Sequence, residues 1–310
     1  MRSPIISKYI YITLGAIFLV TGVVVISFAQ KEDQSVHVAE EVQPGYLIDK
    51  VVRYSFTVQN TTDKPLKGAE FRAYAPVKQT AHQKTEKIKA SSKYDLEVDE
   101  LGNQIMEFHI PFLAPHASKV ITVTAKLKMS SEPNKFAEKQ NPNEMFLEAE
   151  QNLEAQDKQI KKLAKQLKTD GASSTAKSIY DWINKNINYA GYIKEDRGAL
   201  YALENKKGDC TEYAYLFSAL ARANKIPSRV LSGYVYKTNA VVDPADFHNW
   251  SEYLSDSKWH LIDPQGNKFE EDQENYIAMR IISSKNTSKM GGSHRFITTS
   301  NGLRVKINKA

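Results

Sequence analysis

The pattern of hydrophobic and polar residues changes several times along the chain, and each change marks a different kind of structure. Residues 9–29 form a run of 21 uncharged, mostly apolar positions, preceded by Arg2 and Lys8. At 1.5 Å per residue this run spans roughly 30 Å, the thickness of a bilayer core. Residues 1–30 are therefore predicted to be a transmembrane anchor, since the apolar part of a secretory signal is usually only about 7–15 residues. Ser27-Phe28-Ala29 resembles a cleavage site, so a cleaved signal segment is the alternative.

Both interpretations place the rest of the chain outside the cytoplasm. Positive charge before an apolar segment faces the cytosol, and Lys31-Glu32-Asp33 follow the segment on the other side. Residues 31–44 are polar and without periodicity, which predicts a linker. We expect a membrane-anchored, extracytoplasmic protein, periplasmic or on the cell surface, or a secreted one if the segment is cleaved.

Residues 45–130 change to a period of two, which is typical of β-strands. Alternation begins at Val52, and strands fit 69–75, 104–110 and 119–129, with turn residues between them. Short strands separated by turns, with no helical pattern, predict an all-β sandwich domain. His109 and His116 lie near its end as isolated histidines, with no catalytic cluster around them.

From residue 144 the period becomes helical. Apolar stripes predict helices over 144–168 and 174–188, separated by Asp170-Gly171. We assign 131–171 to a helical linker and 172–310 to a second domain. There one more helix is followed by strands over 229–236, 247–254 and 258–262, which indicates an α+β fold because helix and sheet do not alternate. The tail 290–310 is predicted to form a closing pair of strands.

Composition and charge exclude several classes of function and site. The chain has 310 residues, 41% of them hydrophobic and 25% charged, and a formal net charge of +6. Basic residues are spread out and form no compact stripe, so nucleic acid is not an expected partner. A single cysteine, Cys210, rules out an intrachain disulfide and a zinc site built on cysteines.

Cys210 is predicted to open a buried helix. Gly208-Asp209 forms a turn with Asp209 as the N-cap, and Tyr213, Leu216 and Phe217 then recur at helical spacing. The N-terminus of a helix favours negative charge, so a thiolate is stabilised there. A small buried hydrophobe is the alternative for a lone cysteine, unless a base and an orienting carboxylate lie nearby.

His248 and Asp263 are the candidates for those two roles. His248 opens one predicted strand and Asp263 closes the next, and a turn between them makes the strands antiparallel neighbours. Strand alternation places Asp263 on the face opposite to His260, so His248 and not His260 is the predicted base. A thiol needs such a base, and the imidazole needs an acceptor on its other nitrogen.

Four ordered motifs over about residues 145–270 resemble the transglutaminase-like superfamily. They are Gly208-Asp209-Cys210-Thr211-Glu212-Tyr213-Ala214, then Ile226-Pro227-Ser228-Arg229-Val230 with Gly233-Tyr234, then His248-Asn249-Trp250, then Trp259-His260-Leu261-Ile262-Asp263-Pro264. The resemblance implies a papain-like α+β core in which the cysteine helix packs on an antiparallel sheet. It also implies that Cys210 is the nucleophile, His248 the general base and Asp263 its orienting carboxylate. A sandwich before a helical linker is similar to the N-terminal region of bacterial secreted members.

The function implied is a cysteine enzyme that acts on amide bonds of a protein or peptide through a thioester on Cys210. Peptide hydrolysis, deamidation and transamidation stay open, since one triad serves all three. The oxyanion hole is expected to use the backbone N–H of Cys210, with the second donor unassigned. No cofactor is implied, and no metal, because the acidic loops of the family's calcium-dependent branch are missing. The alternative is a non-catalytic binding module of the cell envelope, and the oligomeric state stays open.

Overall fold

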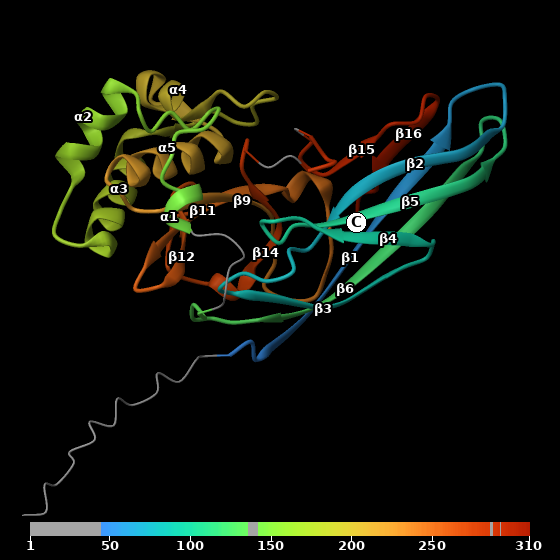
Figure 1. Cartoon of the computed structure of the whole chain (residues 1–310), viewed down its shortest axis with the longest axis horizontal. Helices are drawn as coiled ribbons and strands as arrows, with labels where there is room; N and C mark the ends of the chain where they lie inside the picture. The colour runs from blue at the N-terminus through green and yellow to red at the C-terminus, as the bar shows by residue number, and fades with distance from the viewer. Residues whose placement is uncertain (1–44, 136–141, 286–287, 292) are drawn as a thin grey trace, which may run out of the picture. The chain divides into compact units, whose positions relative to one another are not determined.

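The fold is described from a computed structural model over residues 45–135, 142–285, 288–291 and 293–310 (Figure 1). The expected anchor, 1–30, and the linker, 31–44, lie outside these residues. Over the ranges described, no helix is both long and apolar enough to cross a membrane. The described residues all belong to one compact unit.

Two antiparallel β-sheets face each other in the first part of the chain. The first contains β1 (Ile48–Asn60), β6 (Ser118–Met129) and β3 (Gln83–Ala90), paired in the order β1-β6-β3. The second contains β2 (Leu66–Ala75), β5 (Gln104–Leu113) and β4 (Tyr94–Val98), paired in the order β2-β5-β4. Alternate residues of both sheets are buried between them, as in the burial pattern of β1. The sequence missed β3 and β4, whose exposed lysines and glutamates hide the period of two.

The C-terminal tail completes both sheets of the sandwich. β15 (Phe296–Thr298) pairs with β2, and β16 (Leu303–Ile307) pairs with β1. A closing pair of strands was expected, and both strands are present, but each adds to a different sheet. β10 (Ala240–Val241) also pairs with β1. The domain boundaries proposed from the sequence stay predictions. Strands β10, β15 and β16, which come from the predicted second domain, pair with strands of the predicted sandwich domain.

Among the described residues, the second part of the chain has five α-helices. They are α1 (Pro142–Met145), α2 (Lys158–Leu167), α3 (Ala172–Asn186), α4 (Gly198–Asn205) and α5 (Cys210–Ala223). The single helix expected over 144–168 is wrong: turns separate α1 from α2, and Asn152 in those turns has a left-handed backbone with φ of 64°. Asp157 then caps α2, accepting hydrogen bonds from the backbone N–H groups of Gln159 and Ile160.

A third sheet supports α5. Its strands are β9 (Ser228–Val235), β11 (His248–Ser255), β12 (Lys258–Asp263), β13 (Lys268–Phe269) and β14 (Tyr276–Ile282), in the order β13-β12-β11-β9-β14. α2, α3 and α4 contact the other sides of α5, so twelve of its fourteen residues are buried. The α+β class is therefore confirmed, with a cysteine-bearing helix packed on an antiparallel sheet.

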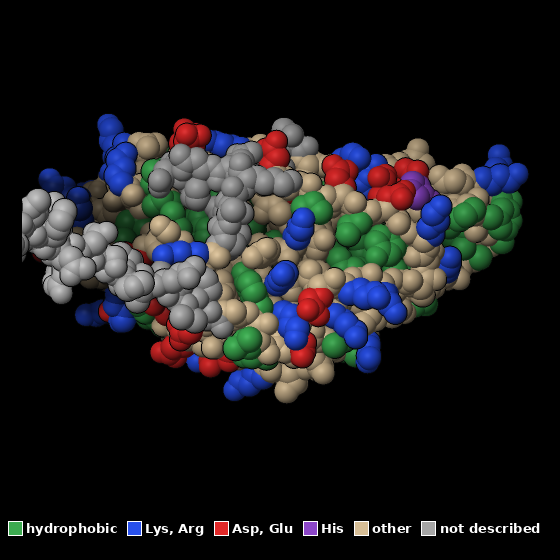
Figure 2. Space-filling view, turned by 60° about the horizontal axis from the view of Figure 1, so that its bottom comes forward, with side chains coloured by type: hydrophobic (Ala, Val, Ile, Leu, Met, Phe, Trp, Pro, Cys, Tyr) green, Lys and Arg blue, Asp and Glu red, His purple; other side chains and the backbone are tan. Residues whose placement is uncertain are grey.

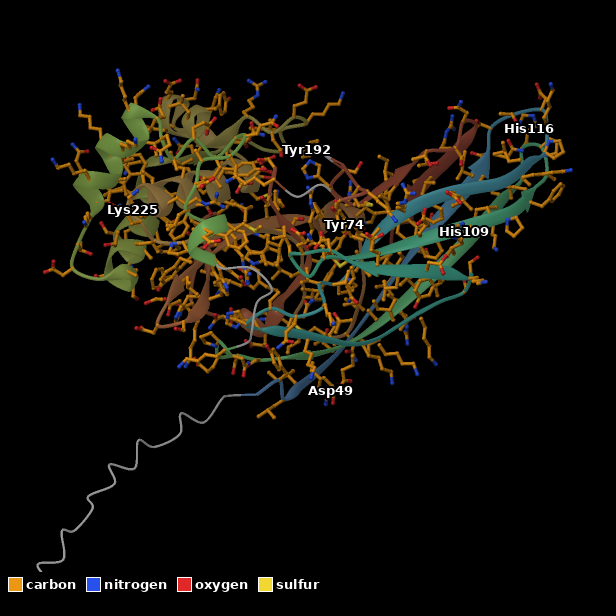
Figure 3. The ribbon with its side chains drawn as sticks, viewed as in Figure 1. Asp49, Tyr74, His109, His116, Tyr192 and Lys225 are labelled. Atoms are coloured by element: carbon orange, nitrogen blue, oxygen red, sulfur yellow. The ribbon has the colours of Figure 1, made fainter. Side chains whose placement is uncertain are left out.

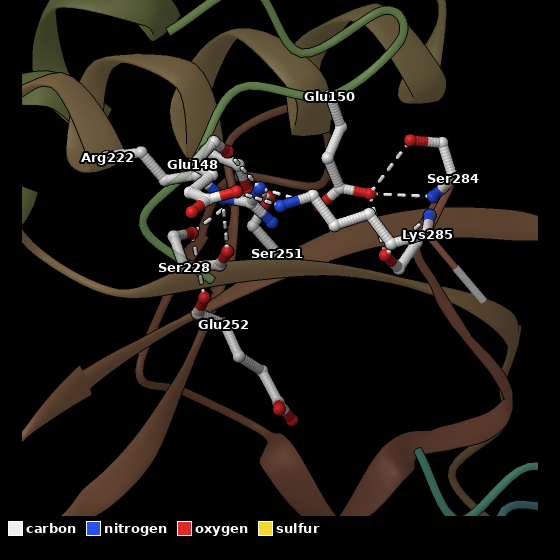
Figure 4. A network of polar contacts seen from close by, with 10 residues as sticks. Glu148, Glu150, Arg222, Ser228, Ser251, Glu252, Ser284 and Lys285 are labelled. Carbon is white, nitrogen blue, oxygen red and sulfur yellow. Dashed lines mark hydrogen bonds and ion pairs between the residues drawn. The ribbon is translucent and has the colours of Figure 1, made fainter. Parts of the chain in front are cut away.

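Polar contacts hold the end of α5 that is remote from Cys210 (Figure 4). Arg222 forms a buried ion pair with Glu150 at 2.7 Å and donates to the backbone oxygens of Ser228 and Glu148. Glu150 also accepts a hydrogen bond from the backbone N–H of Ser284. The carboxylate of Glu150 is thus fully used within the fold.

The outer edge of β14 is covered by the sandwich. The side-chain amide of Gln83 donates to the carbonyl of Ala278 at 3.0 Å and accepts from its N–H at 2.9 Å. Asn103 pairs in the same way with both backbone groups of Ile281, at 3.0 and 2.6 Å. An amide side chain can replace one residue of a neighbouring strand in this way, because it carries one donor and one acceptor. These two residues are completely buried, and they join the sandwich to the sheet that supports α5.

We predict that Gln83→Leu lowers the free energy of unfolding by about 1–3 kcal/mol, because it leaves the N–H of Ala278 buried without a partner, while the C=O still accepts from the N–H of Val77. Urea unfolding followed by circular dichroism measures the change. Gln166→Leu, on the exposed face of α2, is the matched control and should change stability by less than about 0.5 kcal/mol. Equal effects of the two variants would show that the edge of β14 does not depend on Gln83.

Candidate active site

Cys210 is the first residue of α5, as the sequence predicts. The N-cap Asp209 accepts a hydrogen bond from the N–H of Thr211 at 2.8 Å, and Glu212 accepts one from the N–H of Asp209 at 3.0 Å. This reciprocal capping box fixes where the helix begins. The backbone N–H of Cys210 itself has no acceptor among the residues that the structure describes. It therefore stays available at the positive end of the helix.

The same two carboxylates also hold the segment beside the cysteine. Asp209 accepts from the N–H of Ile193 at 2.9 Å, and Glu212 accepts from the N–H of Arg197 at 2.9 Å. Glu212 is completely buried, and this burial raises the pKa of its carboxyl group. One capping box thus positions both Cys210 and the wall of the cleft next to it.

His248 and Asp263 lie on one face of the sheet and touch each other. His248 Nε2 is 2.7 Å from Asp263 Oδ2, across the antiparallel pair of β11 and β12. Ser251, one position out of phase with His248, instead faces α5 and donates to the carbonyl of Ala214. The register that the sequence left undetermined therefore brings His248 to Asp263.

Asp263 is buried and accepts three hydrogen bonds. Besides His248, its donors are the hydroxyl of Tyr276 at 2.8 Å and the backbone N–H of Gly266 at 2.8 Å. Its exposed fraction is 1%, so the carboxylate depends on these donors in place of water. The ring of Trp250 lies against those of both His248 and Tyr276. The sequence missed Tyr276, because the position of β14 beside this site is set only by tertiary pairing.

The environment of His248 favours its protonated form. Burial alone would lower the pKa of His248, but hydrogen bonds to Asp263 and Cys210, and the charges of both, raise it to about 10. An imidazole that contacts a thiol on one side and a buried carboxylate on the other can hold a thiolate–imidazolium pair. The structure thus brings Cys210, His248 and Asp263 together in the order that the chemistry needs.

His260, His109 and His116 do not join this pair. His260 faces away from Asp263 and lies 3.4 Å from Glu270, as strand alternation predicts. His109 and His116 belong to the sandwich, far from the cleft residue Tyr192 (Figure 3). His109 pairs there with Glu70 and Asp95, and His116 pairs with an exposed aspartate.

Cys210 opens into a cleft of about 430 Å³. The wall includes Tyr192 and Ile193, from the segment before α4, and Phe247 and Asn249, around the start of β11. Asn249 donates from Nδ2 to the hydroxyl of Thr211 at 2.8 Å, which ties β11 to the first turn of α5. The cleft is large enough for an extended side chain to reach the sulfur.

We predict that Asp263→Asn lowers the pKa of His248 by at least about one unit, because it removes the negative charge. NMR titration of the histidine rings measures this. A raised folded-state pKa stabilises the fold fully below the unfolded value of about 6.5, and this contribution is lost as the pH rises through about 10. The free energy of unfolding should therefore fall less steeply between these pH values in the variant.

The control for this prediction is Asp63→Asn, which changes a histidine–aspartate pair of similar length, 2.8 Å, at an exposed site. It should leave the pH dependence of stability unchanged, since exposed pairs contribute little. If both variants behave alike, the buried pair does not control the protonation of His248.

Comparisons with known proteins agree with this geometry. Residues 161–264 match the family model of the transglutaminase-like superfamily. No curated protein is similar in sequence. A crystal structure described as a “Putative Cysteine Protease”, from Cytophaga hutchinsonii, has a TM-score of 0.54 at 16% identity and covers 84% of this chain and 93% of its own. The periplasmic domain of TgpA from Pseudomonas aeruginosa has a TM-score of 0.35 at 16% identity. That match covers 68% of this chain and 89% of the TgpA domain. The segment that carries Cys210, His248 and Asp263 thus lies within the match to the transglutaminase-like superfamily.

Proposed function

We propose that this protein is an extracytoplasmic cysteine enzyme that acts on amide bonds through a thioester on Cys210. One observation carries the proposal: His248 lies 2.7 Å from the buried Asp263, and despite burial Asp263 and Cys210 raise the pKa of His248 to about 10. A buried carboxylate that accepts three hydrogen bonds, one of them shared with His248, suits a catalytic role better than a non-catalytic one.

In the first half of the reaction, the Cys210 sulfur attacks the carbonyl carbon of the amide. The C–N bond then breaks, His248 gives its proton to the leaving amine, and a thioester remains on the sulfur. Asp263 holds the imidazole in place and stabilises its positive charge. The N–H of Cys210 is one donor to the oxyanion, because it points from the helix end and has no acceptor within the described residues.

In the second half, another nucleophile attacks the thioester and loses its proton to His248, and the C–S bond breaks to release the Cys210 thiolate. Water gives hydrolysis of a peptide or deamidation of a glutamine, and an amine gives transamidation. The same triad serves each outcome: access of water or an amine to the cleft decides between hydrolysis and transamidation, and the amide that is bound decides between peptide hydrolysis and deamidation. The similar fold of a protein described as a cysteine protease makes peptide hydrolysis the first outcome to test.

We predict that Cys210→Ala and His248→Ala each lower turnover by at least about 10³-fold, with Asp263→Asn about as severe. The full-length protein should be given a panel of glutamine peptides and a tagged primary amine. Peptide fragments indicate a protease, tag incorporation a transamidase, and ammonia alone a deamidase. The surface substitution Asp63→Asn should retain full activity.

A second readout does not depend on the substrate. We expect iodoacetamide to alkylate Cys210 at pH 6 faster than it alkylates an ordinary thiol, and His248→Ala to remove that advantage. If no substrate is turned over and Cys210 is alkylated no faster than an ordinary thiol, the enzyme hypothesis is refuted. The protein would then be a non-catalytic binding module.

The proposed location is the outer side of a membrane, through an uncleaved anchor at residues 1–30. Alkaline phosphatase fused after Ala310 should be active in a bacterial host and should stay with the membrane fraction after washing with carbonate. Release of the fusion into the soluble extracytoplasmic fraction would favour the cleaved signal, and an inactive fusion would contradict an extracytoplasmic location.

A further inference from the structure

A second cavity adjoins the cleft of Cys210. It measures about 400 Å³, and the two share Asp196 and His294 in their walls. Polar side chains line much of the second cavity, among them Tyr215, Arg280 and Ser283. A bound chain that places a carbonyl at Cys210 can therefore extend into a second, polar compartment.

A β-bulge directs Arg280 toward this cavity. β14 pairs with β9 through Ala278 opposite Gly233 and Arg280 opposite Ser232, so Met279 is an extra residue. In a regular strand, Arg280 would lie two positions after Ala278 and on the same face. Ala278 packs in the apolar cluster beneath the sheet. The bulge moves Arg280 to the opposite face instead, and such bulges commonly re-aim a side chain near a functional site. Gly233 permits this, because a Cβ there would lie 1.9 Å from the carbonyl oxygen of Ile277.

Arg280 carries a positive charge that the fold does not neutralise. It is 7% exposed, donates to the carbonyl oxygen of Ser293 at 3.0 Å and lies over the ring of Tyr74 at 5.4 Å. Across the ranges described, no carboxylate forms an ion pair with it. A buried guanidinium without a carboxylate retains donors that suit one.

Arg295 adds a second such charge in the cleft itself. It donates to the carbonyl oxygen of Pro244 at 2.9 Å and lies over the ring of Phe247, again with no carboxylate partner among the described residues. Burial, Arg280 and Arg295 lower the pKa of His294, and outweigh the opposite effect of Asp196. Both arginines therefore act on the place where the two cavities meet.

The acidic residues of these walls are mostly occupied. Glu150 is neutralised by Arg222, and Asp209 caps α5. Asp196 and Asp209 keep their negative charges, and Lys194, Arg280 and Arg295 lie in the same walls. With Glu150 paired to Arg222, three cationic side chains stand beside two carboxylates, which leaves a small excess of positive charge near the cysteine.

We propose that Arg280 and Arg295 form a carboxylate-binding subsite, and that the preferred acyl donor is a peptide with an acidic residue near the reacting amide. The proposal rests on the amide chemistry proposed above for Cys210. The arginines act on specificity, since the bond-breaking steps need only the cysteine, histidine and aspartate.

Binding of a peptide set to the full-length Cys210→Ala variant tests this without turnover. Each capped peptide has one central glutamine, with a glutamate at one of the three positions before or after it, and an isosteric partner has glutamine there. We expect at least one glutamate peptide to bind about tenfold more tightly than its partner, as a charge-assisted hydrogen bond provides. Adding Arg280→Met or Arg295→Met should reduce that preference to less than about twofold, with the glutamine partner unaffected. Arg280→Lys should restore part of it.

Arg304→Met, which removes an exposed arginine of β16, is the matched control and should keep the full preference. Thermal unfolding checks each variant, and Arg295→Met, which is less buried, decides the matter if Arg280→Met fails to fold. Equal binding of glutamate and glutamine peptides, or a preference that survives in Arg295→Met and in a folded Arg280→Met, would overturn the subsite. Absence of turnover in the unmodified protein would refute the amide chemistry alone, because the binding comparison does not depend on it.

Discussion

The buried edge of β14 is the constraint on which the site depends. A strand edge exposes backbone N–H and C=O groups, and burying them without partners is costly. Here Gln83 and Asn103 supply both partners at Ala278 and Ile281. The strand held in this way carries Tyr276, which donates to Asp263. The sandwich is thus more than a spacer, since its side chains complete the sheet that carries the histidine and the aspartate.

The second constraint is the burial of α5. A helix enclosed on nearly all sides cannot shift along its axis without disturbing the helices and strands around it, so its first residue is fixed in space. The capping box then defines that first residue as Cys210. Charged groups near α5 have two kinds of role. Acidic groups close to the helix cap it or form ion pairs, while Arg280 and Arg295 lie in the cavity walls without a carboxylate partner among the described residues. The face in Figure 2, by contrast, mixes lysine and arginine with acidic and apolar side chains, as expected for a solvated surface.

The sandwich and the sheet beneath α5 are also joined through the end of the chain. β15 and β16 follow the residues of the site in the sequence, and they pair with strands of the sandwich. His294 and Arg295, directly before β15, line the cleft for that reason. The tail therefore supplies part of the substrate wall as well as the last strands of the sandwich.

The sequence by itself determined the local features: the N-cap at Asp209, the helix that Cys210 opens, and the alternation that keeps His260 away from Asp263. These depend on residues within a few positions of one another, so periodicity and capping rules suffice. Only the tertiary structure decided the register that joins His248 to Asp263, the approach of Tyr276 and the redirection of Arg280. Strand order, a bulge and pairing between distant segments set these contacts, and such long-range choices leave no periodic trace in the chain.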